Sequence, residues 1–154
     1  EELRAAMRAA AAEADVVVMA AAVADYRPRD VSPTKIKKDA QGDRLDLALV
    51  RNPDILAELT AARRPGQVYI GFAAETEPDG EALVALGRAK AARKGGDLLV
   101  LNRVGWDEGF GAESPNRVLV LDAAGSVRGE ASGSKSHVAG RVLDAVQTVR
   151  NRSK

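Results

Sequence analysis

The sequence predicts an α/β fold with a Rossmann-like, mainly parallel sheet flanked by helices, to which a β-hairpin or basic-loop excursion is added. Three short apolar runs, 16–20, 68–72 and 98–101, have the composition of strands that are buried on both faces of a parallel sheet. Segments with helical spacing precede and separate these runs. This alternation is typical of right-handed βαβ units.

The predicted helices are recognised from their apolar spacing and from the residues at their ends. Asn52 is a suitable N-cap for the second helix, and Pro53 suits its first position. Gly95 and Gly96 suit the C-terminal cap of the third helix. The four predicted helices span residues 2–14, 52–64, 81–94 and 136–150.

Three further stretches complete the predicted fold. Residues 21–34 contain two prolines and several charges, which favour a loop. Residues 45–49 alternate leucine with other residues, as a half-buried strand does. Residues 117–122 and 126–130 flank Ala123-Ala124-Gly125 and predict a hairpin. The whole chain, 1–154, is expected to be one domain.

The composition restricts the chemistry that this domain can perform. Hydrophobic residues make up 45% and aromatic residues 3%, so the core must be aliphatic. A net charge of +1 argues against nucleic acid or a membrane as the partner, and no apolar run is long enough to span a bilayer. Without cysteine, and with His137 as its one histidine, the chain must use Lys, Asp, Asn and backbone groups for catalysis. The lack of cysteine is compatible with the cytoplasm.

Candidate ligand residues follow the predicted strands, because open parallel sheets bind ligands at the carboxyl ends of their strands. Ala22 and Ala24 are small enough to let a ligand approach the backbone, and Asp25 supplies a carboxylate behind them. Asp25 either caps a turn or serves a ligand. Phe72 either belongs to the core or stacks on a nucleotide base.

Basic residues form two clusters that could bind phosphate. Residues 35–38 are either a solvated face or lysines that converge on an anion. Lys90 and Lys94 lie near the end of a helix, where their charge also favours the negative end of the helix dipole. The helix start at Asn52 offers free N–H groups, although helix capping explains this sequence equally well. The chain contains neither a P-loop motif nor the G-x-G-x-x-G motif.

Several stretches, taken in order, resemble the synthetase half of the bacterial bifunctional phosphopantothenoylcysteine decarboxylase/phosphopantothenate–cysteine ligase family. No single stretch is specific, but the ordered set spans nearly the whole chain. The stretches are 20–26 (AAAVADY), 35–38 (KIKK), 52–55 (NPDI), 71–76 (GFAAET), 97–102 ending at Asn102, Phe110-Gly111 with Asn116, and Ser134-Lys135.

The resemblance implies a Rossmann-like homodimer that activates 4′-phosphopantothenate with CTP and joins the acyl-cytidylate to cysteine, in coenzyme A biosynthesis. It implies Mg²⁺ as a divalent cation, with Asp25 as the candidate ligand, and assigns FMN only to the decarboxylase half. Lys35 is the candidate catalytic residue, because cations stabilise the transition state of phosphoryl transfer. The positions that match CTP-binding positions of the family are Ala22, Ala24, Asp25, Lys35, Asn52, Pro53, Asp54, Ile55, Phe72, Lys90 and Lys94.

One difference separates the chain from this family. The family's synthetase domain opens with a further βα unit, which bears a Gly-rich turn and an Asn-containing stretch, whereas this chain begins at Glu1 inside a predicted helix. We therefore expect nucleotide binding without complete catalysis. The alternatives are a non-catalytic module for dimerisation or regulation, against which Asp25, Lys35 and Lys90 argue, and a nicotinamide- or flavin-dependent oxidoreductase.

Overall fold

The computed structural model describes residues 1–37, 43–105 and 116–152. They belong to two compact units: unit 1 comprises residues 1–21 and 55–154, and unit 2 comprises residues 22–54. Unit 1 contains a five-stranded sheet with its helices, and unit 2 contains a two-stranded ribbon.

The sheet of unit 1 has the strand order β1-β4-β5-β6-β7. The strands β1 (Val16–Met19), β4 (Val68–Glu75) and β5 (Leu98–Arg103) run parallel to one another. The strands β6 (Asn116–Asp122) and β7 (Val127–Gly133) form an antiparallel hairpin beside β5. The predicted α/β class and the predicted hairpin are therefore confirmed.

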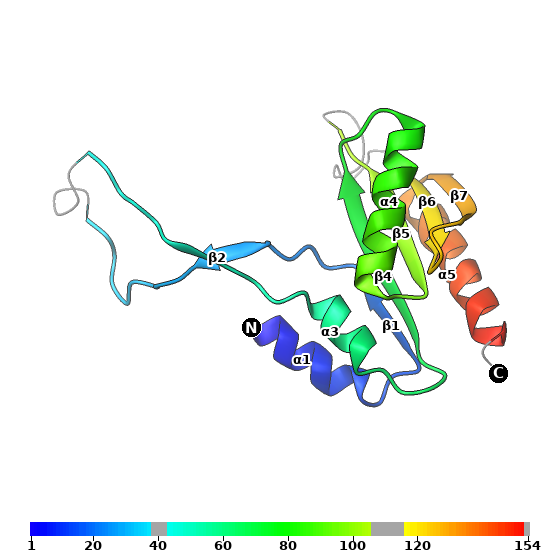
Figure 1. Ribbon diagram of the computed structural model, residues 1–154, viewed down its shortest axis with the longest axis horizontal. Coiled ribbons are helices and arrows are strands. Elements are labelled where there is room, and N and C mark those ends of the chain that lie inside the picture. The colour runs from blue at the N-terminus through cyan, green and yellow to red at the C-terminus, as the bar shows by residue number, and fades with distance from the viewer. Residues whose placement is uncertain (38–42, 106–115, 153–154) are drawn as a thin grey trace. The chain divides into compact units, whose positions relative to one another are not determined.

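Helices cover both faces of this sheet (Figure 1). The helices α1 (Glu2–Ala11), α3 (Ile55–Ala61) and α4 (Gly80–Lys94) lie on one face, and α5 (Lys135–Arg152) lies on the other. The α5 face buries Ile70 and Val100 against Val142. Burial of aliphatic side chains on both faces explains how a chain so poor in aromatic residues forms a core.

The helix α4 ends at Lys94, as the sequence predicts, and begins at Gly80, one residue before the predicted start. The side chain of Asp79 caps the helix by accepting a hydrogen bond of 2.8 Å from the N–H of Ala82. Gly95 ends the helix with a φ of 66°, a left-handed conformation that glycine adopts without strain. Inside the helix, Gly87 permits close packing, since a Cβ there would lie 2.8 Å from Leu101 Cδ2.

Two local predictions, one about a helix cap and one about strand burial, are wrong. The side chain of Asn52 does not cap α3, which begins only at Ile55; its amide donates to the carbonyl oxygen of Ala24 at 2.7 Å and accepts from Arg27 at 2.8 Å. A cap residue loses that role when its side chain has other partners. The strand at 16–20 is not buried on both faces, because Val18 is 42% exposed in β1, which is an edge strand among the described residues.

The prediction of a half-buried strand at 45–49 is also wrong. Unit 2 instead pairs β2 (Tyr26–Pro28) with β3 (Leu49–Arg51) in antiparallel orientation. Leu47 is 60% exposed, so the alternating leucines of this stretch do not face a core among the described residues. Alternation alone therefore did not identify a buried face.

Candidate functional site

Polar side chains gather at the carboxyl edge of the sheet in unit 1. Glu75 is the last residue of β4, and Asn102 lies next to the end of β5. Because β6 runs antiparallel to β5, its first residue, Asn116, lies at this same edge. This is the edge at which open α/β sheets bind ligands.

Asn102 and Asn116 lie on the α5 face of the sheet. Asn102 is paired with Val118, and Asn116 is two residues before Val118, so the two asparagines are diagonal neighbours on one face. The Oδ1 atom of each is buried and has no hydrogen-bond partner within the described part of the chain. An unsatisfied buried acceptor costs about 1–3 kcal/mol, so its presence asks for an explanation.

Glu75 and Lys90 form an ion pair on the α4 side of the sheet. The Lys90 ammonium contacts Oε1 of Glu75, an oxygen that is buried and otherwise without a hydrogen bond. The side chain of Lys90 is 32% exposed and that of Glu75 is 17% exposed, so solvent screens this ion pair only in part. A ligand anion at Lys90 would have to share the ammonium with Glu75.

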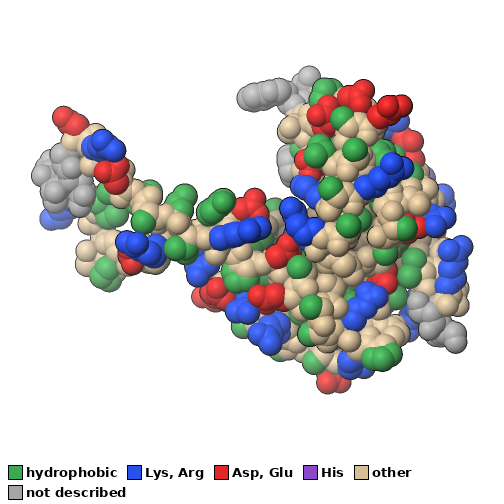
Figure 2. Space-filling model, in the orientation of Figure 1, with side chains coloured by type: hydrophobic (Ala, Val, Ile, Leu, Met, Phe, Trp, Pro, Cys, Tyr) green, Lys and Arg blue, Asp and Glu red, His purple; other side chains and the backbone are tan. Residues whose placement is uncertain are grey.

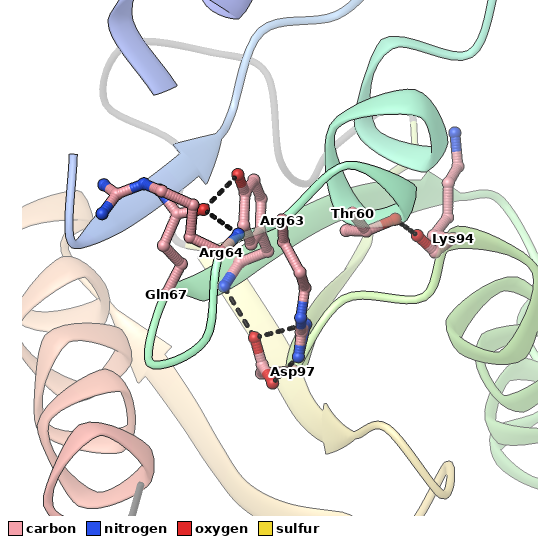
Figure 3. A network of polar contacts seen from close by, with 7 residues as sticks. Thr60, Arg63, Arg64, Gln67, Lys94 and Asp97 are labelled. Atoms are coloured by element: carbon pink, nitrogen blue, oxygen red, sulfur yellow. Dashed lines mark hydrogen bonds and ion pairs between the residues drawn. The ribbon is translucent and has the colours of Figure 1, made fainter. Parts of the chain in front are cut away.

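The other predicted ligand residues of unit 1 occupy different environments. Phe72 is 39% exposed on β4, which is compatible with contact to a ligand. Ile55 is 7% exposed and belongs to the core between α1, α3 and the sheet. Lys94 lies at the far end of α4, where its carbonyl oxygen accepts a hydrogen bond from Thr60 and its ammonium points away from that contact (Figure 3). The structure therefore does not bring Lys94 to the carboxyl edge.

In unit 2, Asn52 connects two of the predicted ligand residues. Its backbone N–H donates to the carbonyl oxygen of Asp25 at 2.7 Å, and its side-chain amide donates to that of Ala24 at the same distance. Ala22, Asp25 and Lys35 are exposed. Their roles as ligand residues, like those of Pro53 and Asp54, stay predictions. Lys38 and Phe110-Gly111 lie outside the described residues.

Asp25 is also the predicted metal ligand. Across residues 1–37, 43–105 and 116–152, no three or more His, Cys, Asp or Glu side chains form a group that could hold a metal ion. Mg²⁺ is commonly held by one or two carboxylates together with substrate phosphates. A single carboxylate at Asp25 would therefore bind this cation only jointly with ligand oxygens.

Sequence reasoning assigned no role to Glu75, Asn102 or Asn116, although all three lie in the stretches that carry the resemblance. The available signal was their position at strand ends. To place Asn116 at this edge, one must also know that β6 runs antiparallel to β5. The burial of the oxygens could not be read from the sequence, because it depends on contacts made in the folded chain.

The described surface shows no other strong signal for a partner. Basic and acidic side chains are interspersed over the visible face (Figure 2), in agreement with the small net charge. Within the described segments, no helix is both long and apolar enough to cross a bilayer. A cavity of about 580 Å³ between α1 and α3 and another of about 250 Å³ between β7 and α5 lie outside the polar edge.

The fold and its strand order define a Rossmann-like α/β domain with a polar carboxyl edge. The model of the family described as the C-terminal domain of DNA/pantothenate metabolism flavoproteins matches residues 1–149, so the chain belongs to this family.

Curated relatives agree with the family match. The coenzyme A biosynthesis bifunctional protein CoaBC of Mycobacterium tuberculosis (strain ATCC 25618 / H37Rv) is 44% identical over 140 residues, which cover 88% of this chain and 33% of the relative. The protein of the same name from Escherichia coli (strain K12) is 40% identical over 115 residues, covering 73% and 27%. The chain therefore spans about a third of the length of the curated relatives that it matches.

Solved structures show the same fold. The C-terminal domain of a coenzyme A biosynthesis bifunctional protein CoaBC superposes with a TM-score of 0.72 at 26% identity, covering 98% of this chain and 62% of that one. The DNA/pantothenate metabolism flavoprotein from Streptococcus pneumoniae gives a TM-score of 0.70 at 18% identity, covering 96% and 69%. The second likeness supports the fold alone.

These findings correct the family assignment made from the sequence. The description of the matching family names a flavoprotein and not a ligase, and this finding overturns the assignment to the synthetase half. The function and partners that depended on it are corrected with it: CTP-dependent ligation, with CTP, 4′-phosphopantothenate and cysteine as partners of a homodimer. Ordered motifs located the family, but one Rossmann-like sheet supports many chemistries, and motif order does not decide among them.

The name of the family raises the question of a flavin site. A flavin requires room for a planar three-ring system and donors for its phosphate. At the carboxyl edge of unit 1, Phe72 is the one aromatic side chain of β4 and β5 on the α5 face, and Lys90, on the α4 side, is already paired with Glu75. The described residues of this edge therefore do not provide both requirements on one face of the sheet, and no step is derived through a flavin.

Proposed function

We propose that this chain is a domain of an enzyme of coenzyme A biosynthesis that binds 4′-phosphopantothenoylcysteine. The observation that carries the proposal is the match of most of this chain to relatives named as bifunctional proteins of coenzyme A biosynthesis, at up to 44% identity. Because the chain spans only a third of those relatives, their complete activity is not attributed to it. A cytoplasmic location is part of this proposal.

The proposed ligand carries groups that match the polar edge of unit 1. Its phosphate and carboxylate are anions, for which Lys90 is the proposed partner. Its amides present N–H groups, which the oxygens of asparagines can accept. Phe72 would contact an apolar part of the chain between these groups. The polar edge therefore offers partners for an anion, for the amides and for an apolar segment of the ligand.

The predicted ligand residues of unit 2 keep a place in this proposal. Lys35 is exposed and offers an ammonium to an anion, where a charge-assisted contact contributes about 1.5–3 kcal/mol. Asp25 offers one carboxylate to Mg²⁺, which would need further oxygen ligands from an anion. These two roles are proposed for unit 2 by itself.

Titration calorimetry of the purified chain with 4′-phosphopantothenoylcysteine tests the proposal. Saturable binding that weakens for the dephosphorylated compound and for Lys90→Gln is the expected result, because both changes remove one partner of an ion pair. Pantothenate, which lacks both the phosphate and the cysteine, is the control ligand. Absence of binding at millimolar ligand would refute the proposal. Binding of FMN with a changed visible spectrum would instead favour a flavin-dependent function.

A further inference from the structure

We propose that the cavity between α1 and α3 binds an organic phosphate monoester, whose phosphate lies between Arg8 and Arg64 and whose apolar body lies against Ala12 and Ala62. The cavity belongs to unit 1 alone and has a volume of about 580 Å³. Cavities of roughly 300–1,000 Å³ are typical of small-molecule sites. Its lining includes no residue of α4 or of the polar carboxyl edge, so the site is separate from the one that contains Lys90.

Three arginines line this cavity, and two of them have no carboxylate partner among the described residues. Arg4 donates to Glu58 at 2.7 Å, so its charge is balanced within the cavity. Arg8 makes no hydrogen bond or ion pair within the described part of the chain. The guanidinium of Arg64 reaches only the carbonyl oxygen of Ala14, at 3.5 Å, which is a weak contact. Three guanidiniums and one carboxylate give the lining a net charge of +2.

A buried amide connects the backbone segments that carry the two unpaired arginines. Gln67 is 6% exposed, and its Nε2 donates to the carbonyl oxygens of Ala11 and Ala14 at 2.8 Å and 2.7 Å, close to the end of α1. Its Oε1 accepts from the backbone N–H of Arg64 at 2.8 Å and from the hydroxyl of Tyr69 at 3.2 Å (Figure 3). The two sides of the cavity are therefore fixed before a ligand arrives, which lowers the entropic cost of binding.

Most of the remaining lining is apolar and includes exposed residues. Ala12 of the segment after α1 and Ala61 and Ala62 at the end of α3 are exposed and border the cavity. Their side chains are small, so they leave the space between the two helices open to a ligand. An apolar group that covers them is removed from water, which favours binding. The ligand should therefore carry an apolar body beside its charged group.

The charge of the cavity selects the charged group. A phosphate monoester carries about −1.5 to −2 charges at pH 7 and so balances the net charge of the lining. A carboxylate or a sulfate ester carries a single charge and would leave one guanidinium uncompensated. Guanidinium forks bind phosphate oxygens in pairs and are weakly hydrated, so they give up little on contact. A phosphate monoester meets these conditions better than either singly charged anion.

Titration of the purified chain with phenyl phosphate, followed by backbone amide shifts in NMR spectra, tests the proposal. The expected result is saturable binding with shift changes at Ala12 and Ala62. Arg8→Gln and Arg64→Gln should each weaken binding by about tenfold, because each removes a charge-assisted contact. Arg93→Gln is the matched control, since it removes an exposed arginine of α4 outside the cavity and should leave the affinity unchanged.

A second comparison leaves the protein unchanged. Phenyl sulfate keeps the ring but has one charge, and it should bind the natural chain about fivefold more weakly than phenyl phosphate does. Inorganic phosphate keeps the charge but lacks the ring, and it should also bind more weakly, because the apolar lining stays in contact with water. This comparison stays informative even if an arginine variant fails to fold.

The competing explanation is that both arginines only stabilise the negative ends of the helices that precede them. In that case Arg8→Gln and Arg64→Gln would lower the unfolding temperature and leave the affinity for phenyl phosphate unchanged, a result that overturns the site. The site is also overturned if millimolar phenyl phosphate produces no saturable shifts at Ala12 and Ala62, or if the shifts are confined to the surroundings of Lys90. Equal affinity for phenyl phosphate and phenyl sulfate would overturn the assignment to a phosphate monoester.

Discussion

Arg63 donates two hydrogen bonds to the carboxylate of Asp97, at 2.9 Å and 3.1 Å, so that a guanidinium fork clamps the residue that precedes β5 (Figure 3). The same carboxylate accepts the backbone N–H of Tyr69 at 2.7 Å. Asp97 therefore connects the segment that follows α3 to the starts of two neighbouring strands. The Arg63 and Asp97 side chains are 34% and 20% exposed, which places this contact between a surface ion pair and a buried one.

Asp97→Ala should lower the free energy of unfolding by about 2–3 kcal/mol, because it leaves a guanidinium and a strand N–H without their acceptor. Asp97→Asn should cost less, since its amide oxygen can still accept from Tyr69. Urea unfolding monitored by circular dichroism measures both changes. Arg63→Lys is the matched control for the fork, because lysine keeps the charge but cannot bind both oxygens in the same plane. An Asp97→Ala variant as stable as the natural chain would show that the clamp is not needed.

Gly87→Ala in α4 and Gly140→Ala in α5 should change stability in opposite directions. A Cβ at Gly87 would lie 2.8 Å from Leu101 Cδ2 and 3.0 Å from Leu121 Cδ2, and this overpacking should outweigh the gain of about 1 kcal/mol in helix propensity. A Cβ at Gly140 meets nothing within 4 Å, so only the gain remains. Thermal unfolding of the two variants is the measurement. A stabilised Gly87→Ala variant would mean that the two leucines can move aside.

Asp122 should stabilise the β6–β7 hairpin in a pH-dependent way. Burial acts to raise the pKa of its carboxyl, but hydrogen bonds from the N–H of Ser126 and from Arg128 outweigh this and lower the pKa below its usual value. A lowered folded-state pKa means that the contribution is complete above the unfolded-state pKa and is lost as the pH falls through the folded-state pKa. Asp122→Asn should therefore be less stable at neutral pH, and the difference from the natural chain should shrink below about pH 4. A difference independent of pH would assign the effect to packing.

Glu75→Gln and Lys90→Gln should have opposite effects on binding of a phosphorylated ligand. Glu75 now shares the Lys90 ammonium, so its neutral replacement should tighten binding by a few-fold, whereas Lys90→Gln should weaken it by about tenfold or more. Titration calorimetry at low and at high salt measures both, and salt should reduce both effects. If neither variant alters the affinity, the anion binds elsewhere.

The sequence predicted the parts of the fold in which local pattern and tertiary packing agree. The three apolar runs became β1, β4 and β5, and Gly95 ended α4 as expected. The failures lie where a side chain found a distant partner. Asn52 has the sequence context of a helix cap, yet it bonds to Ala24 and Arg27 across the chain. No local pattern contains that information.

The candidate site was predictable in position but not in chemistry. The rule about strand ends pointed to the edge of the sheet at which the structure gathers Glu75, Asn102 and Asn116, and binding of a ligand there stays a prediction. The sequence could not show that Ile55 is buried, that Lys90 pairs with Glu75, or that two asparagine oxygens lack partners. Each of these depends on contacts between residues far apart in the chain.

The reversal of chain direction at β6 has a consequence for the carboxyl edge of the sheet. In a purely parallel sheet, each connection leaves the carboxyl edge and returns to the opposite one. Between β5 and β6, by contrast, the chain departs at Arg103 and re-enters the sheet at Asn116, both at the carboxyl edge. The first residues of β6 therefore share this edge with the last residues of β5, so substitutions in β6 can change the polarity of the edge while the three parallel strands stay constant.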